Sequence, residues 1–154
     1  MSLGYFDDLS DANEYFMDER LITTAWDDLA DDATKTKAIK NAYNRIYYSP
    51  KYDVPKYADA SAAQLVILKK ANGEMAYFLA QHLEDEDRRK GLQIQGITDA
   101  GIVKEKYSKD DLMSLPIPPF VDTLLKDFKT AKAFGMVDIE RDEDEDVDEK
   151  VDDF

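Results

Sequence analysis

The sequence contains no cysteine and a single histidine, His82, among 154 residues. Without cysteine, disulfides, thiolate catalysis and cysteine-based zinc sites are excluded, and one histidine excludes multi-histidine metal centres. Glycine is scarce, with six residues in the chain, and there is no glycine-rich phosphate loop, G-x-S-x-G turn or H-E-x-x-H motif. We therefore expect no enzyme activity, no metal site and no cofactor.

Long apolar runs are missing as well. No segment approaches the roughly 20 apolar residues that span a bilayer, and the first residues lack the charged-then-apolar pattern of a signal peptide. These absences predict a soluble protein that does not bind membranes. Hydrophobic residues still make up 44% of the chain, which is enough for the core of one domain.

Basic residues are few relative to acidic ones: 20 against 34, for a formal charge of −14. The excess is concentrated in residues 138–154, which hold eleven acidic and two basic residues, so the remainder of the chain carries only −5. Such a run repels itself and has little to bury. We therefore divide the chain into a domain of residues 1–137 and an extended acidic C-terminal tail of residues 138–154.

Apolar spacing and capping residues predict a mainly α fold, a small bundle of four to five helices. Three helices are expected first, over residues 10–20, 24–29 and 31–48. A capping box opens the longest helix, over residues 61–83, and residues 84–91 are expected to form a charged turn. The predicted core consists of Tyr15, Phe16, Trp26, Ile39, Ile46, Leu68, Met75 and Leu79.

The C-terminal part of the domain is predicted to contain a short β-hairpin and one more helix. The hairpin insertion, at about residues 92–107, has two apolar segments around a turn at residues 98–101. Prolines at 116, 118 and 119 then end the loop and favour a helix start. That helix carries one apolar stripe, which consists of Val121, Leu124, Leu125 and Phe128.

Two further patterns have ordinary structural explanations that we favour over functional ones. His82 shares a helix face with Met75 and Phe78, so we expect a core or boundary histidine, not a catalytic base. A cluster of tyrosines interleaved with basic residues is typical of surfaces that stack single-stranded bases, but a chain of charge −14 repels phosphate. These tyrosines are Tyr43, Tyr47, Tyr48, Tyr52 and Tyr57.

The order of motifs over roughly residues 5–130 resembles the head-completion proteins of tailed bacteriophages, the head–tail connectors or adaptors. Some relatives in that family are labelled DnaT-like single-stranded-DNA-binding proteins. A Y-x-x-x-x-x-A-x-x-Y-F-x-x-R-L segment is followed there by A-W-x-x-L, an acidic cap, a long helix and an I-P-P helix start. The matching positions here are Tyr5, Ala12, Tyr15, Phe16, Arg20, Leu21, Ala25, Trp26, Leu29, Ile117, Pro118 and Pro119.

The resemblance implies a structural virion protein. Its copies would form a ring, dodecameric to match the portal, in the virion neck below the portal vertex, after assembly in the host cytoplasm. The ring would extend the DNA channel without binding DNA specifically, and it would contact a downstream neck or tail protein. The alternatives are a single-stranded-DNA-binding accessory protein and an acidic-tailed protein-interaction module.

We expect residues 118–154 to contact the portal or a neighbouring subunit. The apolar stripe of the last helix is one that a small body leaves partly uncovered, and apolar residues continue into a polar segment, as in segments that order on binding. In the alternative, this helix lies wholly within the subunit. The predicted partner-binding residues are Pro118, Phe120, Val121, Leu124, Leu125, Phe128, Phe134, Met136 and Ile139.

Overall fold

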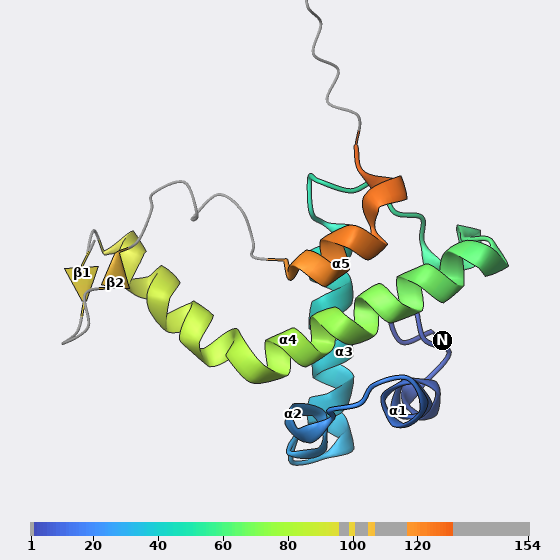
Figure 1. The fold of residues 1–154 in the computed structure, drawn as a ribbon, viewed down its shortest axis with the longest axis horizontal. Helices are drawn as coiled ribbons and strands as arrows, with labels where there is room; N and C mark the ends of the chain where they lie inside the picture. Colours follow the sequence, from blue (N-terminus) through green and yellow to red (C-terminus); the bar gives the residue numbers. More distant parts are fainter. Residues whose placement is uncertain (1, 96–98, 101–104, 107–116, 131–154) are drawn as a thin grey trace, which may run out of the picture.

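The computed structural model describes residues 2–95, 99–100, 105–106 and 117–130, which form the mainly α fold that the sequence predicts (Figure 1). The helices are α1 (Leu9–Asp18), α2 (Thr24–Asp27), α3 (Asp32–Tyr47), α4 (Ala62–Ile94) and α5 (Pro119–Leu124). Short 3-10 turns, η1 (Tyr57–Asp59) and η3 (Lys126–Phe128), precede α4 and follow α5.

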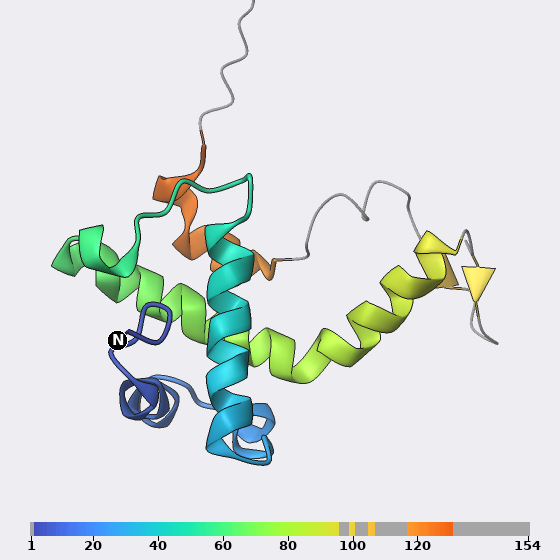
Figure 2. The same cartoon turned by 180° about the vertical axis from the view of Figure 1, so that it is seen from behind.

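Helix α4 is the element around which the others pack. It contacts α3, α5, α2 and α1, and Figures 1 and 2 show α3 crossing it while α1 and α2 lie at one end of α3. Its buried positions, including Leu68, Ala71, Met75 and Leu79, recur at helical spacing and face Ile39 and Ile46 of α3 in one core. Of the eight predicted core residues, all but the half-buried Tyr15 are buried.

The helix starts follow local capping rules. The Asp31 side chain accepts a hydrogen bond from the Thr34 backbone N–H at 2.7 Å, as expected for the N-cap of α3. Ser61 and Gln64 form the predicted reciprocal capping box, with distances of 2.9 and 3.3 Å. The predicted start of α1 at residue 10 is wrong by one position, because the helix begins at Leu9 and its cap is Asp8, whose carboxylate accepts a hydrogen bond from the Asp11 N–H.

Three ion pairs fasten α1 and its following loop to α4. Asp11 pairs with Lys69 at 2.5 Å, Glu19 with Lys70 at 2.7 Å, and Arg20 with Glu74 at 3.0 Å. The acidic residues on the α4 side of α1 are therefore matched by cations. In the part of the chain that the structure describes, no cation lies at ion-pair distance from Glu14 or Asp18.

The charged turn predicted over residues 84–91 is wrong, because α4 continues through it to Ile94. The sequence there, Glu-Asp-Glu-Asp-Arg-Arg-Lys, places acidic residues one helical turn before basic ones. That order and spacing favour a helix in solvent and complement the helix dipole. We call residues 84–94 the arm, since Figures 1 and 2 show this part of α4 leaving the body.

The strand prediction is correspondingly wrong at residues 92–94, which belong to α4. Strands β1 (Asp99–Ala100) and β2 (Glu105–Lys106) pair antiparallel over two residues each, a smaller ladder than the two six-residue strands expected. The acidic tail of residues 138–154, with Phe134 and Met136 before it and Ile139 within it, lies outside the described residues.

Candidate partner interface

Helix α5 starts where the prolines predict, with Pro119 in its first turn and Pro118 as the cap residue. The interior of its stripe is formed by Val121 and Leu125, which are fully buried, and by Phe128, which is 8% exposed. These three side chains belong to the core cluster that α4 also lines. The burial of these three residues agrees with the alternative, in which this helix packs within its own subunit.

The outer side of α5 is where predicted partner residues remain accessible. Phe120 is 57% exposed, a large aromatic side chain with no place in the core. Pro118 and Leu124 are half-buried at its edge. The exposed apolar surface of α5 is therefore centred on Phe120.

The end of the described chain is clamped to the loop after α3. Lys129 and Tyr52 form an antiparallel bridge, flanked by hydrogen bonds from Asp53 N to Phe128 O at 2.7 Å and from Thr130 N to Lys51 O at 3.0 Å. The Thr130 hydroxyl also donates to the Pro50 and Lys51 carbonyls, at 3.0 and 3.2 Å. This clamp fixes the position at which the C-terminal segment leaves the body.

A polar network joins the clamp to α5. The Tyr52 hydroxyl donates to Asp122 Oδ1 at 2.5 Å, and the Lys129 ammonium donates to Asp122 Oδ2 at 2.7 Å. The Lys129 hydrogen bond, followed by that of Tyr52, holds the pKa of the Asp122 carboxyl below its usual value. Burial, followed by the hydrogen bond to Asp122, raises the pKa of Tyr52.

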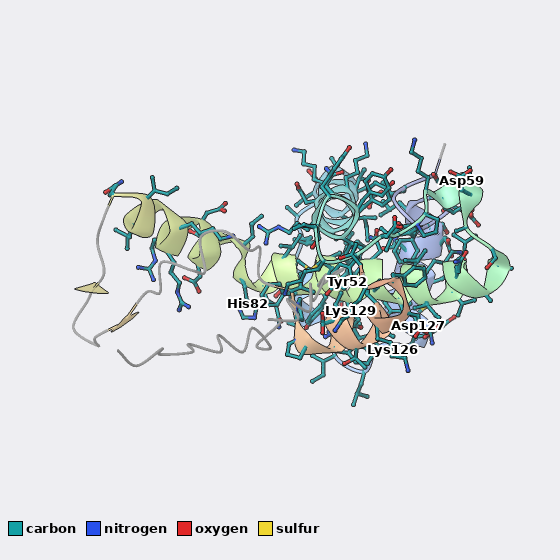
Figure 3. The ribbon with its side chains drawn as sticks, turned by 90° about the horizontal axis from the view of Figure 1, so that it is seen from above. Tyr52, Asp59, His82, Lys126, Asp127 and Lys129 are labelled. Carbon is teal, nitrogen blue, oxygen red and sulfur yellow. The ribbon has the colours of Figure 1, made fainter. Side chains whose placement is uncertain are left out.

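A shallow groove of about 500 Å³ lies beside the clamp. Three carboxylates line it, those of Asp53, Asp59 and Asp127, over the apolar side chains of Ile67 and Phe128; Figure 3 labels two of these acids with Tyr52 and Lys129. Within the described ranges no three carboxylates or imidazoles gather to hold a metal ion. The groove is thus an acidic surface feature.

His82 is the one side chain that the sequence offers as a catalytic base. His82 is exposed where the arm leaves the body (Figure 3), and its ring centroid lies 4.9 Å from that of Phe78. Of the two expectations, a core or a boundary histidine, the core one is therefore wrong. Phe78, one helical turn before it, is half-buried and packs against the core, whereas His82 does not.

The five tyrosines do not form one open stacking surface. Tyr52 is buried, Tyr57 donates its hydroxyl to Asp7, and Tyr43 stacks on Tyr47 with centroids 5.3 Å apart. Tyr48, which is 75% exposed, is the member most open to solvent. Tyr43, whose ring centroid lies 5.1 Å from that of Tyr5, and Tyr57 therefore join α3 and its following loop to the N-terminal segment, whereas Tyr52 joins that loop to α5.

Sequence reasoning missed an exposed apolar group between α1 and α2. Leu21 is 97% exposed, and Met17 and Ile22 are also open to solvent. Beside them lies a groove of about 530 Å³ whose lining includes Phe16 and Trp26. The signal is present in the sequence, since Leu21 and Ile22 are consecutive apolar residues after the end of a predicted helix. Our prediction uses Leu21 only as a motif position and does not consider Ile22.

No protein-family model matches the chain, and no similar curated protein or solved structure was found by comparison. Among the described residues, no helix is both long enough and apolar enough to cross a bilayer.

Proposed function

We propose that the protein is a head–tail connector subunit, a structural protein of the phage neck that forms a ring on the portal and extends the DNA channel. The observation that carries the proposal is the arm: α4 runs on past Leu83, its last residue packed against the core among those described. A helix held out in solvent gives a lone subunit nothing to bury, whereas it gives an assembly a surface for contact.

We infer the kind of assembly, a connector ring, from the order of the sequence motifs. Apart from the exposed Leu21, the motif residues from Tyr5 to Leu29 pack together: Phe16 stacks on Trp26 at 4.2 Å and Arg20 binds Glu74. Within the same proposal, the subunit is a small helical bundle with a β-hairpin at the end of the arm and an acidic tail. The comparisons neither add to this assignment nor oppose it.

On this proposal, the portal is contacted by the outer side of α5 and the segment that follows the clamp. Phe120 supplies an exposed aromatic anchor, the type of residue that dominates protein interfaces. The segment leaves the body at Thr130, where the clamp ends. We expect a chain that ends at residue 131 to fold normally, because it keeps all the Thr130 hydrogen bonds, but to lose co-purification with portal rings of the same phage.

Point variants separate the two parts of this surface. Phe120→Asp should weaken portal binding in the full-length chain, whereas Tyr48→Asp, an exposed aromatic on α3's C-terminal side, should leave it unchanged. Binding is measured by mass determination of the portal complex. If both the truncated chain and Phe120→Asp assemble on the portal as well as the wild type does, this docking surface is wrong.

A DNA-binding assay tests the proposal against its nearest competitor. A channel subunit of charge −14 should bind neither single- nor double-stranded DNA at physiological salt, because binding to phosphates relies on basic groups that release counterions. A salt-sensitive dissociation constant below about 1 µM for single-stranded DNA, lost in Tyr48→Ala, would instead favour the accessory-protein function.

A further inference from the structure

We propose that the acidic tail of residues 138–154 docks on the solvent side of α3 in its own chain. This surface, here called the α3 outer face, consists of exposed residues that recur at helical spacing: Lys37, Lys40, Asn41, Asn44 and Tyr48. The contact concerns the free subunit, so it goes beyond the connector function proposed above and does not rest on it.

The α3 outer face belongs to the longest stretch of the chain without an acidic residue. Residues 33–52 contain five basic residues and no aspartate or glutamate, in a chain that has 34 of them. The opposite side of α3, with Ile39, Ala42 and Ile46, is buried in the core. The outer face is therefore a basic, solvent-exposed surface on an acidic protein.

The lysines of this surface have no carboxylate partner among the described residues. No carboxylate there lies at ion-pair distance from Lys37, from Lys40 or from Lys51, which follows α3 at the clamp. Lys37 acts on Asp31 from beyond that distance, and Asp31 already accepts the Thr34 N–H. These three ammonium groups are therefore open to an acidic segment from outside the described body.

The other two basic residues of the stretch are already engaged. Lys35 lies over the Trp26 ring, 5.4 Å from its centroid, and the Arg45 side chain has a partner. Neither residue contributes to the proposed contact.

The clamp places the start of the C-terminal segment at one end of the α3 outer face. Thr130 binds the carbonyls of Pro50 and Lys51, just beyond Tyr48 in the sequence, and Figures 1 and 2 show this end of α3 opposite α1 and α2. The eight residues from Thr130 to Asp138 reach about 26 Å when extended. The eleven helical steps from Tyr48 back to Lys37 span about 17 Å. The tail can therefore reach every lysine of the face.

Charge favours this face over the rest of the body. The tail carries eleven acidic and two basic residues, while residues 7–32 carry ten acidic residues and one basic residue, and the arm four and three. The groove beside the clamp is lined by Asp53, Asp59 and Asp127. Each of these surfaces repels the tail or gives it no net attraction. Because the clamp tethers the tail beside α3, its effective concentration there is on the order of mM, and an unattached polyanion has to compete with it.

Cross-linking within the full-length chain tests the contact, because the native sequence has no cysteine. One variant carries Asn41→Cys and Asp144→Cys, and the control carries Ala63→Cys and Asp144→Cys. Ala63 is exposed and lines the acidic groove with Phe128, so a tail without a preferred site would also meet it. In dilute solution a short thiol linker should join positions 41 and 144 at least about threefold faster than positions 63 and 144. Equal rates, or a faster control, overturn the proposal.

Charge reversal distinguishes docking from simple proximity. Lys40→Glu should slow the cross-link between positions 41 and 144 at least about threefold. Lys126→Glu, an exposed lysine on η3 (Figure 3), makes the same change of net charge outside the face and should not slow it. The preference for position 41 should vanish at about 1 M salt, where the Debye length is about 3 Å. A preference that persists in this salt, or equal slowing by the two reversals, overturns the contact.

Mixing single-cysteine chains identifies which copy supplies the tail. Asn41→Cys and Asp144→Cys in separate chains should cross-link far more slowly than the same pair within one chain, and equal rates overturn the intramolecular contact. Portal capture keeps the two proposals separate. Lys40→Glu should not lower it, because the α3 outer face is not part of the surface centred on Phe120. If the wild-type tail prefers position 41 but the protein does not bind the portal, only the connector function is wrong.

Discussion

Gly73 and Gly91 lie in the same helix but in opposite surroundings. A Cβ atom on Gly73 would lie 2.5 Å from Tyr15 Cε1, and the Tyr15 ring is held by its hydroxyl bond to Glu74 at 2.9 Å. A Cβ atom on Gly91 meets nothing within 4 Å. Gly73 is thus the point at which α1 approaches α4 closely.

The two glycines give a matched pair of substitutions. Gly73→Ala should lower the free energy of unfolding by about 1–3 kcal/mol through overpacking. Gly91→Ala should leave it unchanged or raise it by up to about 1 kcal/mol through helix propensity. Urea unfolding measures both. Equal effects of the two substitutions would mean that Tyr15 can move aside without cost.

Trp26 is the largest buried side chain of the N-terminal half. It is 2% exposed, stacks on Phe16, and donates from Nε1 to Asn13 Oδ1 at 3.0 Å. Trp26→Ala should destabilise the fold by about 3–5 kcal/mol because it leaves a cavity and an unpaired amide oxygen. In thermal or urea unfolding, Tyr48→Ala serves as the exposed control, with an expected change within about 0.5 kcal/mol.

Buried tyrosines set the alkaline limit of stability. Burial is the first cause that raises the pKa values of Tyr5 and Tyr15 above the usual 10.0. Folding therefore keeps these phenols neutral, so their contribution is complete below pH 10.0 and is lost as the pH rises above it toward the raised pKa values. We expect the melting temperature to fall above pH 10.0, and to fall less steeply in Tyr5→Phe relative to its own neutral-pH value.

At the scale of elements, α4 is one helix with two sources of stability. As far as Leu83 its residues bury apolar surface against the other helices, whereas the arm depends on charge spacing along the helix. Amide hydrogen exchange should therefore be slow over residues 68–79 and much faster over residues 84–94.

A charge reversal tests the basis of the arm's helicity. Glu84→Lys places a cation one turn before Arg88, so it should speed exchange of the arm amides and leave the core amides unchanged. The expected local cost is about 0.5 kcal/mol, and it should shrink in high salt. Unchanged exchange in the arm would show that propensity alone maintains this helix. Glu14→Lys, on α1, is the control for a change of net charge.

The elements that could be predicted from the sequence are those determined by nearby residues. Asp31 and the Ser61–Gln64 box mark helix starts because a cap needs only residues within one turn. Our prediction places a turn at residues 84–91 because a run of charged residues can form either a solvated turn or an exposed helix. Acidic and basic residues four positions apart favour the helix. The local pattern predicts the apolar stripe of α5 but not the surface against which the stripe packs. Val121 and Leu125 are buried in their own subunit because of where α4 lies, and residues near them in the sequence do not determine that position.

At the scale of the whole molecule, the arm makes the subunit longer than its size requires. A helix of 33 residues is about 50 Å long. If it were compact, a chain that ends at residue 131 would have a radius of gyration of about 14 Å. Small-angle scattering of that chain should give a radius of gyration clearly above this value. A radius at or below about 14 Å would mean that the arm folds back onto the body in solution.

The clamp at Thr130 also determines how the subunit responds to force. The hydrogen bonds between residues 128–130 and residues 50–53 follow one another along the chain, and those of Thr130 lie nearest the C-terminal end. A pull transmitted through the C-terminal side loads them one after another, so they rupture at low tension. The fully buried Leu125 is loaded only after Phe128 has come away. The clamp should therefore be the first part of the subunit to open under force. A partner that pulls on the C-terminal segment would free several more residues of chain while the helical core stays folded.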